Sequence, residues 1–353
     1  MVVALTTTTI GVIGLVVVCA GWIVYGLFNV FAGRKEAGSE IELAPNRKPY
    51  YDDETLEGPR LERMQLWGVV LLVITVIALP LYWVFEPDRQ AGAQEGWDNR
   101  FASWGSQLFA PTAEGGFNCA GCHGGMQAVG GEAPFTVTDP VTREVQAVNW
   151  KAPALNTALY KFDESEIRFI LNYGRPFSPM SPWGLVGGGP MNAQQIDTLI
   201  AYIKSIQIPR ENCGEGEDPL VCDSGNLPAE LQTEIQTAAE KAVADGEAET
   251  VGEALFNLEL GSGAYSCARC HTLGWSYGQP GVSGQGAFGW NLTGGSVNAH
   301  FESQDQLVQF VQNGSEFGKL YGRNGQGSGR MPGFGNLLTD EQLDAILEYV
   351  RSL

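Results

Sequence analysis

Two long apolar stretches near the N-terminus stand apart from the rest of the chain, where apolar residues recur at helical spacing between polar ones. Residues 10–31 and 66–85 contain no charged residue, and they are 22 and 20 residues long. A helix of about 20 apolar residues crosses the hydrocarbon core of a bilayer. We therefore predict two transmembrane helices, at about 10–31 and 66–85, within an N-terminal segment of residues 1–90.

The charges around these two stretches predict their orientation. The basic residues between them are Arg34, Lys35, Arg47, Lys48, Arg60 and Arg63. Residues 1–9 carry no Lys or Arg, and loops rich in these residues stay on the cytoplasmic side of a membrane. We expect a two-pass protein of the cell membrane, with the residues after 85 on its outer, extracytoplasmic face. A cleaved signal peptide is the alternative for the first stretch, but its start would carry positive charge.

The chain repeats itself beyond residue 97. Residues 97–208, the first repeat, resemble residues 251–353, the second repeat, and residues 191–206 align without a gap with residues 338–353. These aligned segments have apolar residues at the spacing of one buried helical stripe. The stripe residues are Ile196, Leu199, Ile200 and Ile203, and then Leu343, Ile346, Leu347 and Val350. Asn192 and Thr339 are the expected N-caps. We predict a mainly α fold, with two small helical domains and little strand.

An acidic connector, residues 209–250, separates the repeats. The chain carries 40 Asp and Glu against 21 Lys and Arg, a formal net charge of −19. This charge excludes a nucleic-acid partner, because phosphate binding requires clustered Lys and Arg. One connector helix is predicted by the spacing of Leu231, Ile235, Ala238, Ala239 and Ala242. The rest is expected to be solvated. Cys213 and Cys222 are expected to pair on an oxidising face, with two free thiols as the alternative.

Each repeat contains one C-x-x-C-H motif. The motif residues are Cys119, Cys122 and His123, and then Cys267, Cys270 and His271. A structural zinc site needs four N or S ligands, whereas each motif offers three. A redox pair of the thioredoxin type needs no histidine and lies in a βαβ unit. Haem attachment uses every residue, since the two thiols bind the vinyl groups and the histidine binds the iron. We predict two covalently attached c-type haems.

Methionines are the candidates for the second axial ligand of each iron. Met331 is the only methionine of the second repeat. In the first repeat, Met180 follows the motif at a similar distance, whereas Met126 is too close to the motif to reach the opposite face. Met191 is the alternative, but it aligns with Leu338, where a hydrophobe packs on the first helical turn. The predicted metal ligands are therefore His123 with Met180 and His271 with Met331.

Further residues are candidates for the surroundings of the haems. The carbonyl of Pro153 is expected to accept a hydrogen bond from the His123 imidazole and to fix its orientation. Arg175 is either a partner for a haem propionate or a surface arginine. Phe288, Trp290 and Leu292 line the second pocket or belong to the core. The one remaining histidine, His300, is expected to have a surface or capping role.

Both repeats resemble class I c-type cytochromes, which have C-x-x-C-H after an N-terminal helix, a methionine loop and a final helix with an aromatic residue ("LIAYIKSI", "ILEYVRSL"). The whole chain is similar to the dihaem subunit of cbb-type oxidases. It is also similar to the dihaem cytochrome c subunit of actinobacterial menaquinol:cytochrome c reductases. The resemblance implies two class I cytochrome c domains after the two transmembrane helices. It also implies partners: cytochrome b and Rieske-type subunits of a quinol oxidoreductase, subunits of a haem-copper oxidase, or both.

Ligation of the iron by histidine and methionine raises the reduction potential relative to ligation by two histidines, and it leaves no open position on the iron. These properties favour electron transfer over catalysis. We expect an electron-transfer subunit of a respiratory complex, between quinol oxidation and a terminal oxidase, rather than a stand-alone enzyme. The alternative is a catalytic dihaem enzyme such as a peroxidase, which would need one accessible iron.

Overall fold

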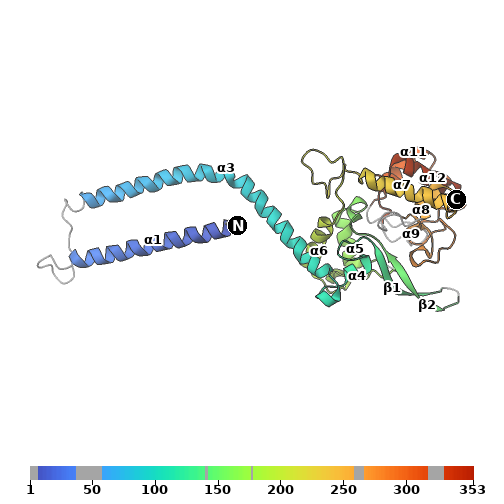
Figure 1. Cartoon of the computed structure of the whole chain (residues 1–353), viewed down its shortest axis with the longest axis horizontal. Helices are drawn as coiled ribbons and strands as arrows, with labels where there is room; N and C mark the ends of the chain where they lie inside the picture. The colour runs from blue at the N-terminus through green and yellow to red at the C-terminus, as the bar shows by residue number, and fades with distance from the viewer. Residues whose placement is uncertain (1–6, 37–57, 140–141, 176–177, 258–265, 317–329) are drawn as a thin grey trace. The chain divides into compact units, whose positions relative to one another are not determined.

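The computed structural model describes residues 7–36, 58–139, 142–175, 178–257, 266–316 and 330–353, and it is mostly helical (Figure 1). The chain divides into two compact units, residues 1–88 and 89–353, which we describe separately. The main helices are α1 (Thr7–Glu36), α3 (Pro59–Phe109), α4 (Cys119–His123), α5 (Glu164–Tyr173), α6 (Ala193–Ser205), α7 (Ala229–Ala244), α8 (Val251–Asn257), α9 (Ala268–His271), α10 (Ser296–His300), α11 (Gln304–Asn313) and α12 (Asp340–Ser352). The short 3-10 helices are η1 (Thr112–Glu114), η2 (Ala158–Tyr160), η3 (Leu185–Gly187) and η4 (Trp275–Tyr277).

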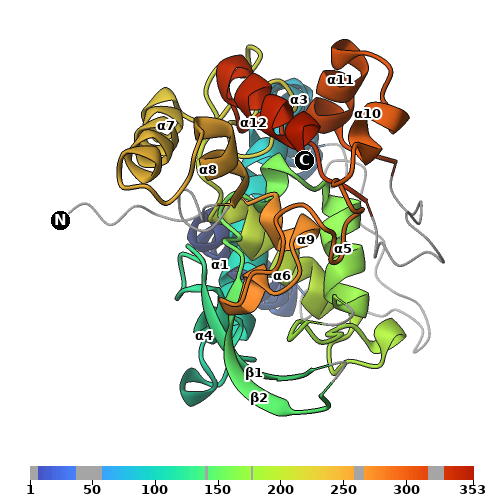
Figure 2. The ribbon, with the colours of Figure 1, turned by 90° about the vertical axis from the view of Figure 1, so that its right-hand side faces the viewer.

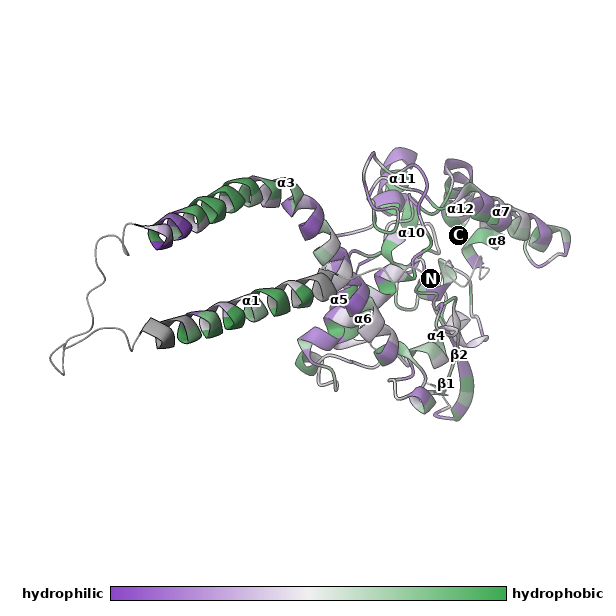
Figure 3. Cartoon of the chain, turned by 60° about the vertical axis from the view of Figure 1, so that its left-hand side comes forward, coloured by the Kyte–Doolittle hydropathy of each residue, from purple (hydrophilic) through white to green (hydrophobic). Residues whose placement is uncertain are grey.

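Both apolar stretches of the first unit are helical. The stretch 10–31 lies in α1, and the stretch 66–85 lies in α3. Figure 3 shows long green, hydrophobic segments in both helices. Large side chains such as Phe28 (72% exposed) and Trp83 (76% exposed) face outward, which is unlike a core helix of a soluble protein. Within the described residues, α3 is long and apolar enough to cross a membrane, and α1 contains a shorter apolar segment, Val16–Phe31.

Helix α3 runs on well past the predicted end of the second apolar stretch. The resemblance to class I cytochromes implies an N-terminal helix ahead of the first motif, and in the structure this helix is the end of one that continues from Pro59 to Phe109. Pro80 and Pro87 lie inside it. Each proline removes one backbone hydrogen bond of the helix but leaves its other bonds in place.

The two repeats pack their first and last helices in the same way. In the first repeat, a Cβ on Gly105 of α3 would lie 1.9 Å from the Thr198 carbonyl oxygen of α6. In the second, a Cβ on Gly252 of α8 would lie 2.0 Å from the Ala345 carbonyl oxygen of α12. Glycine therefore permits a close helix crossing in each repeat. The ring of Tyr202 lies 5.2 Å from that of Phe109, and the equivalent pair, Tyr349 and Phe256, is 5.4 Å apart.

The final helices form as their sequences predict. The predicted stripe residues of α6 and α12 are all buried. Asn192 and Thr339 each accept a hydrogen bond from the backbone N–H three residues later, with a glutamine completing a capping box at both positions. Both predictions are confirmed, because a capping box and a 3.6-residue period depend on neighbouring residues alone.

A β-hairpin in the first repeat departs from the predicted scarcity of strand. Strands β1 (Gly131–Thr138) and β2 (Val145–Ala152) pair antiparallel, from Gly131 opposite Ala152 to Thr138 opposite Val145. Alternate residues Trp150 and Ala152 are buried, so one face of β2 is covered. Figure 2 shows the hairpin extending below α9, and the end of β2 contacts η4 of the second repeat through Trp150 and Tyr277. Proline and glycine in this region obscured the alternating pattern in the sequence.

The connector contacts both repeats at several buried residues, such as Arg210, Cys222 and Leu227, while most of its other residues outside the predicted helix are exposed, so the prediction of a solvated connector holds only in part. Its predicted helix is α7, in which Ile235, Ala239 and Ala242 are buried, although Ala238 is exposed. Leu227 and Ile235 share one apolar core with Tyr160 of the first repeat and with the second repeat.

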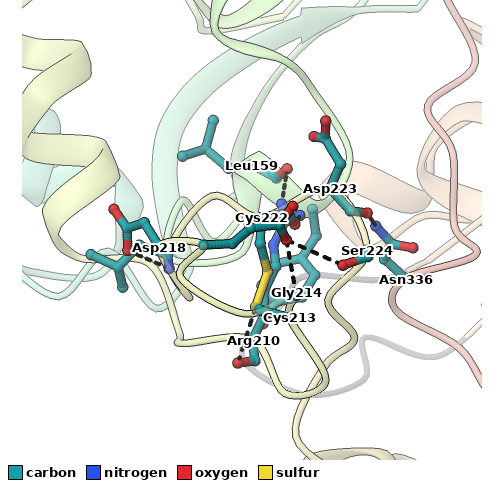
Figure 4. The surroundings of a disulfide bond; sticks show 12 residues. Leu159, Arg210, Cys213, Gly214, Asp218, Cys222, Asp223, Ser224 and Asn336 are labelled. Atoms are coloured by element: carbon teal, nitrogen blue, oxygen red, sulfur yellow. Dashed lines mark hydrogen bonds between the residues drawn. A yellow bond between two sulfur atoms is a disulfide. The ribbon is translucent and has the colours of Figure 1, made fainter.

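A disulfide between Cys213 and Cys222 closes one loop of the connector (Figure 4), which confirms the predicted pairing. The guanidinium of Arg210 donates hydrogen bonds to the carbonyls of Cys222 and Leu159. The Asn336 amide donates to the carbonyl beside the disulfide, that of Asp223, over 2.9 Å. The connector thus joins the repeats through hydrogen bonds as well as apolar contacts.

Candidate haem sites

The first motif lies in the one-and-a-half-turn helix α4, which places its cysteines and its histidine on one short segment. His123 is buried, and its Nδ1 lies 2.8 Å from the carbonyl oxygen of Pro153. Because the carbonyl can only accept, Nδ1 carries the proton, and Nε2 is left with a lone pair for a metal. This confirms the predicted contact with Pro153. Burial lowers the pKa of His123, which also keeps the ring neutral.

The second motif begins at Cys267, the N-cap of helix α9, and its other residues lie in that helix. Its histidine is held in the same manner as His123. The Nδ1 of His271 lies 2.7 Å from the carbonyl oxygen of Trp290. A Cβ on Gly289 would lie 2.7 Å from Cε1 of this imidazole, so the backbone can pass the ring only without a side chain. The sequence suggested the side chain of Trp290 as a pocket residue. The structure shows that its carbonyl fixes the histidine, while its ring is half exposed.

The four motif cysteines form no disulfide. Burial raises the pKa of Cys119 to about 11 and that of Cys267 to about 12. A thioredoxin-like pair lies in a βαβ unit, whereas these cysteines lie in or beside the short helices α4 and α9, and the sheet of the described residues is a single antiparallel hairpin. In the described part of the chain, no three His, Cys, Asp or Glu side chains gather in the way that a zinc site needs. The residues therefore fit a haem, with two thiols for covalent attachment and one imidazole nitrogen for the iron.

Met180 and Met331 make matching backbone hydrogen bonds with residues that follow the preceding helices α5 and α11. The Met180 carbonyl accepts a hydrogen bond from the N–H of Arg175 (2.8 Å), and that of Met331 accepts one from Ser315 (2.9 Å). A serine hydroxyl also accepts a bond from each methionine N–H. Each loop begins at a glycine that ends a helix, with φ +71° at Gly174 and +73° at Gly314. The repeat therefore extends to the methionine loops, a correspondence that sequence spacing alone left approximate.

The predicted methionine ligands differ from their alternative in burial. Met180 is half-buried and packs against the same core as Cys119 and Leu155. Met331 is also half-buried, against the core that contains Cys267. Met191 is completely buried, in the core beneath α6. The choice of Met180 over Met191 stays a prediction, because iron ligation depends on the bound haem.

Three other candidates are placed by the structure. The guanidinium of Arg175 lies 5.4 Å from the centre of the Phe162 ring and is partly exposed. Phe288 packs toward Trp150 of the first repeat, with ring centres 6.2 Å apart. His300 is exposed at the end of α10 with its ring edge against Phe301, in agreement with a surface role.

These features define the class of the second repeat as a c-type cytochrome domain, a small helical unit in which a C-x-x-C-H motif binds haem covalently. Residues 250–350 match the protein family described as cytochrome c oxidase, cbb3-type, subunit III. The match covers the second repeat and supports a covalently bound c-type haem and electron transfer there. Comparisons with curated proteins and with solved structures give no match.

Proposed function

We propose that the chain is a membrane-anchored dihaem c-type cytochrome that transfers electrons on the outer face of the membrane. The observation that carries this proposal is the duplication of the whole haem site. Each repeat has two unpaired motif thiols, an imidazole fixed by a backbone carbonyl, and a methionine with matching backbone hydrogen bonds. The family match reaches only the second repeat, and the duplication extends its chemistry to the first.

The protein's own residues would attach each haem, orient the histidine that binds its iron and set its reduction potential. A c-type haem, once attached through Cys119 and Cys122 or through Cys267 and Cys270, supplies a one-electron redox change. The carbonyls of Pro153 and Trp290 hold the two imidazoles in one tautomer and orientation. Met180 and Met331 are the residues that would hold the two irons together with the histidines, and such ligation would raise the reduction potential and leave no position for a small ligand.

We further propose that the chain works as a subunit of a respiratory complex, between quinol oxidation and a terminal oxidase. The two apolar helices anchor it, with residues 34–63 in the cytoplasm, as the basic residues between them predict. Its partners are then cytochrome b and Rieske-type quinol oxidoreductase subunits, haem-copper oxidase subunits, or both. Purification in mild detergent, followed by identification of the co-purifying subunits, tests this assignment. Isolation without any of these partners would contradict it.

A matched set of methionine variants tests the ligands. The haem content of the wild type, measured as the pyridine haemochrome, should be two per chain. Met180→Ala and Met331→Ala should each remove half of the weak red absorption band of methionine-bound ferric haem. Met191→Ala should leave the band intact and destabilise the protein by about 2–5 kcal/mol, as expected for a fully buried methionine. Loss of the band in Met191→Ala would reverse the assignment.

A further inference from the structure

The end of strand β2 contacts both haem-attachment motifs. The carbonyl of Pro153, just after the strand, accepts the hydrogen bond of His123 over 2.8 Å. The carbonyl of Lys151 accepts a hydrogen bond of 2.5 Å from Nη1 of Arg269. Arg269 lies between the two cysteines of the second motif. Only Ala152 therefore lies between Pro153, whose carbonyl holds His123, and Lys151, whose carbonyl is held by the second motif.

Trp150 and Lys151 of this segment, residues 150–153, pack against the second repeat. Trp150 is only 8% exposed, and its ring centre lies 5.5 Å from that of Tyr277. The Lys151 ammonium lies 4.8 Å from the ring centre of Trp275, and the Arg269 guanidinium lies 5.1 Å from the same centre. Cations held over an aromatic face have restricted positions. The contact is thus a defined interface, and the hydrogen bond of Arg269 is one part of it.

The charge of Arg269 also reaches the first motif. Its guanidinium donates to the Lys151 carbonyl, two residues before Pro153, whose carbonyl holds the His123 imidazole, so the positive charge lies beside the backbone that carries this histidine's partner. Interactions between charges in buried surroundings are screened little by salt. A residue of the second motif therefore contributes to the electrostatic potential at the histidine of the first.

We propose that Arg269 is a positioning and charge-tuning residue for the haem site of the other repeat, and that electrons pass between the two haems across residues 150–153. The proposal rests on the proposed function, since it needs a haem on each motif. The guanidinium holds the Lys151 carbonyl, and through it the backbone that carries Pro153. Its charge would disfavour the ferric state of a haem bound to the first motif, because that state carries one more positive charge than the ferrous state.

Arg269→Gln, Arg269→Lys and the control Arg143→Gln test this proposal in the full chain in detergent. Arg143 is exposed near the tip of the same hairpin, so its variant removes an equal charge away from both motifs. The pyridine haemochrome gives the haem content of each protein. Spectroelectrochemical titration gives both potentials, and Met180→His identifies the first haem, since replacing methionine by histidine lowers its potential. Pulse radiolysis then gives the rate at which an added electron redistributes between the haems.

We expect Arg269→Gln to lower the potential of the first haem and to slow redistribution several-fold, while Arg143→Gln matches the wild type in both measurements. Arg269→Lys should keep the potential, because it keeps the charge, yet slow redistribution, because it lacks the guanidinium. An unchanged potential of the first haem in Arg269→Gln, or an equal shift in Arg143→Gln, would overturn the proposal. One haem per chain in the wild type would overturn the proposed function instead. If Arg269→Gln loses haem, Arg269→Lys carries the test through its redistribution rate.

Discussion

Replacing Gly174 with alanine tests how the Met180 loop is held. Gly174 ends α5 with φ +71° and ψ −166°, a backbone conformation that essentially only glycine adopts. A Cβ there would lie 2.4 Å from the Met180 carbonyl oxygen and 2.7 Å from the backbone nitrogen of Pro182. Both atoms belong to the backbone of the loop. The loop would have to move by about 1 Å to restore ordinary van der Waals contact.

The structure allows the cost of this substitution to be worked out. The backbone conformation costs an alanine about 1–3 kcal/mol. Movement of the Met180 carbonyl also weakens its 2.8 Å hydrogen bond from the Arg175 N–H, a bond worth about 0.5–1.5 kcal/mol. We expect Gly174→Ala to lower the free energy of unfolding by about 2–4 kcal/mol. Gly188→Ala is the control, because Gly188 also has a positive φ (+88°) but no atom within 4 Å of its Cβ position. That variant should cost about 1–2 kcal/mol.

The assay is unfolding of the full chain in detergent, followed by circular dichroism and by the red band of methionine-bound ferric haem. Gly174→Ala should weaken the band at temperatures where the helices are still folded, whereas Gly188→Ala should lose band and helix together. Equal destabilisation by the two substitutions, with an intact band in both, would refute the reasoning that Gly174 holds the methionine loop.

Three further predictions follow from other contacts. Gly289→Ala should displace the His271 imidazole, since the new Cβ would lie 2.7 Å from the ring. We expect a fall in haem content, absent in the control Gly281→Ala, whose new Cβ would make only an ordinary contact of 3.5 Å with the Leu273 carbonyl oxygen. Cys213→Ser should lower the free energy of unfolding by about 2–3 kcal/mol. A reducing agent should destabilise the wild type by a similar amount and should have no effect on the stability of the variant. Asp163 caps α5, and a hydrogen bond from a nearby serine hydroxyl holds the pKa of its carboxyl below the ordinary value. The stability that the Asp163 carboxylate contributes is therefore present above pH ~4 and is lost as the pH falls through its lower folded-state pKa. Asp163→Ala should lower the free energy of unfolding by about 1 kcal/mol at neutral pH. It should also make the stability of the protein depend less on pH in acid.

The haem chemistry could be predicted from the sequence because it depends on residues that are neighbours in the chain. Two cysteines and a histidine within five residues need no tertiary contact to be recognised as an attachment motif. The buried stripe of α12 and its capping box at Thr339 are equally local. The alignment of the repeats paired Met180 with Met331 by the same kind of evidence, and their matching backbone hydrogen bonds strengthen that pairing.

The partners of the motif residues could be predicted only in part. The carbonyl of Pro153 was predicted as the acceptor for His123, since a proline-containing segment follows the motif in a suitable place. The carbonyl of Trp290 was not predicted as the acceptor for His271, because every residue has a backbone carbonyl and the sequence does not show which one lies near the imidazole. The sequence indicated only the Trp290 side chain as a candidate pocket residue. The hairpin was missed because Pro134 interrupts an alternating pattern that was already short.

The sequence alone predicts two apolar helices, a duplicated region and the groups proposed to bind haem, since each of these predictions depends on periodicity or on residues adjacent in the chain. The tertiary structure decided how the duplicated parts work on one another. Arg269 and Lys151 are 118 residues apart, and no local pattern encodes their contact. It exists because the hairpin of one repeat packs on the motif of the other, and because buried hydrogen-bonding groups must find partners wherever the fold brings them.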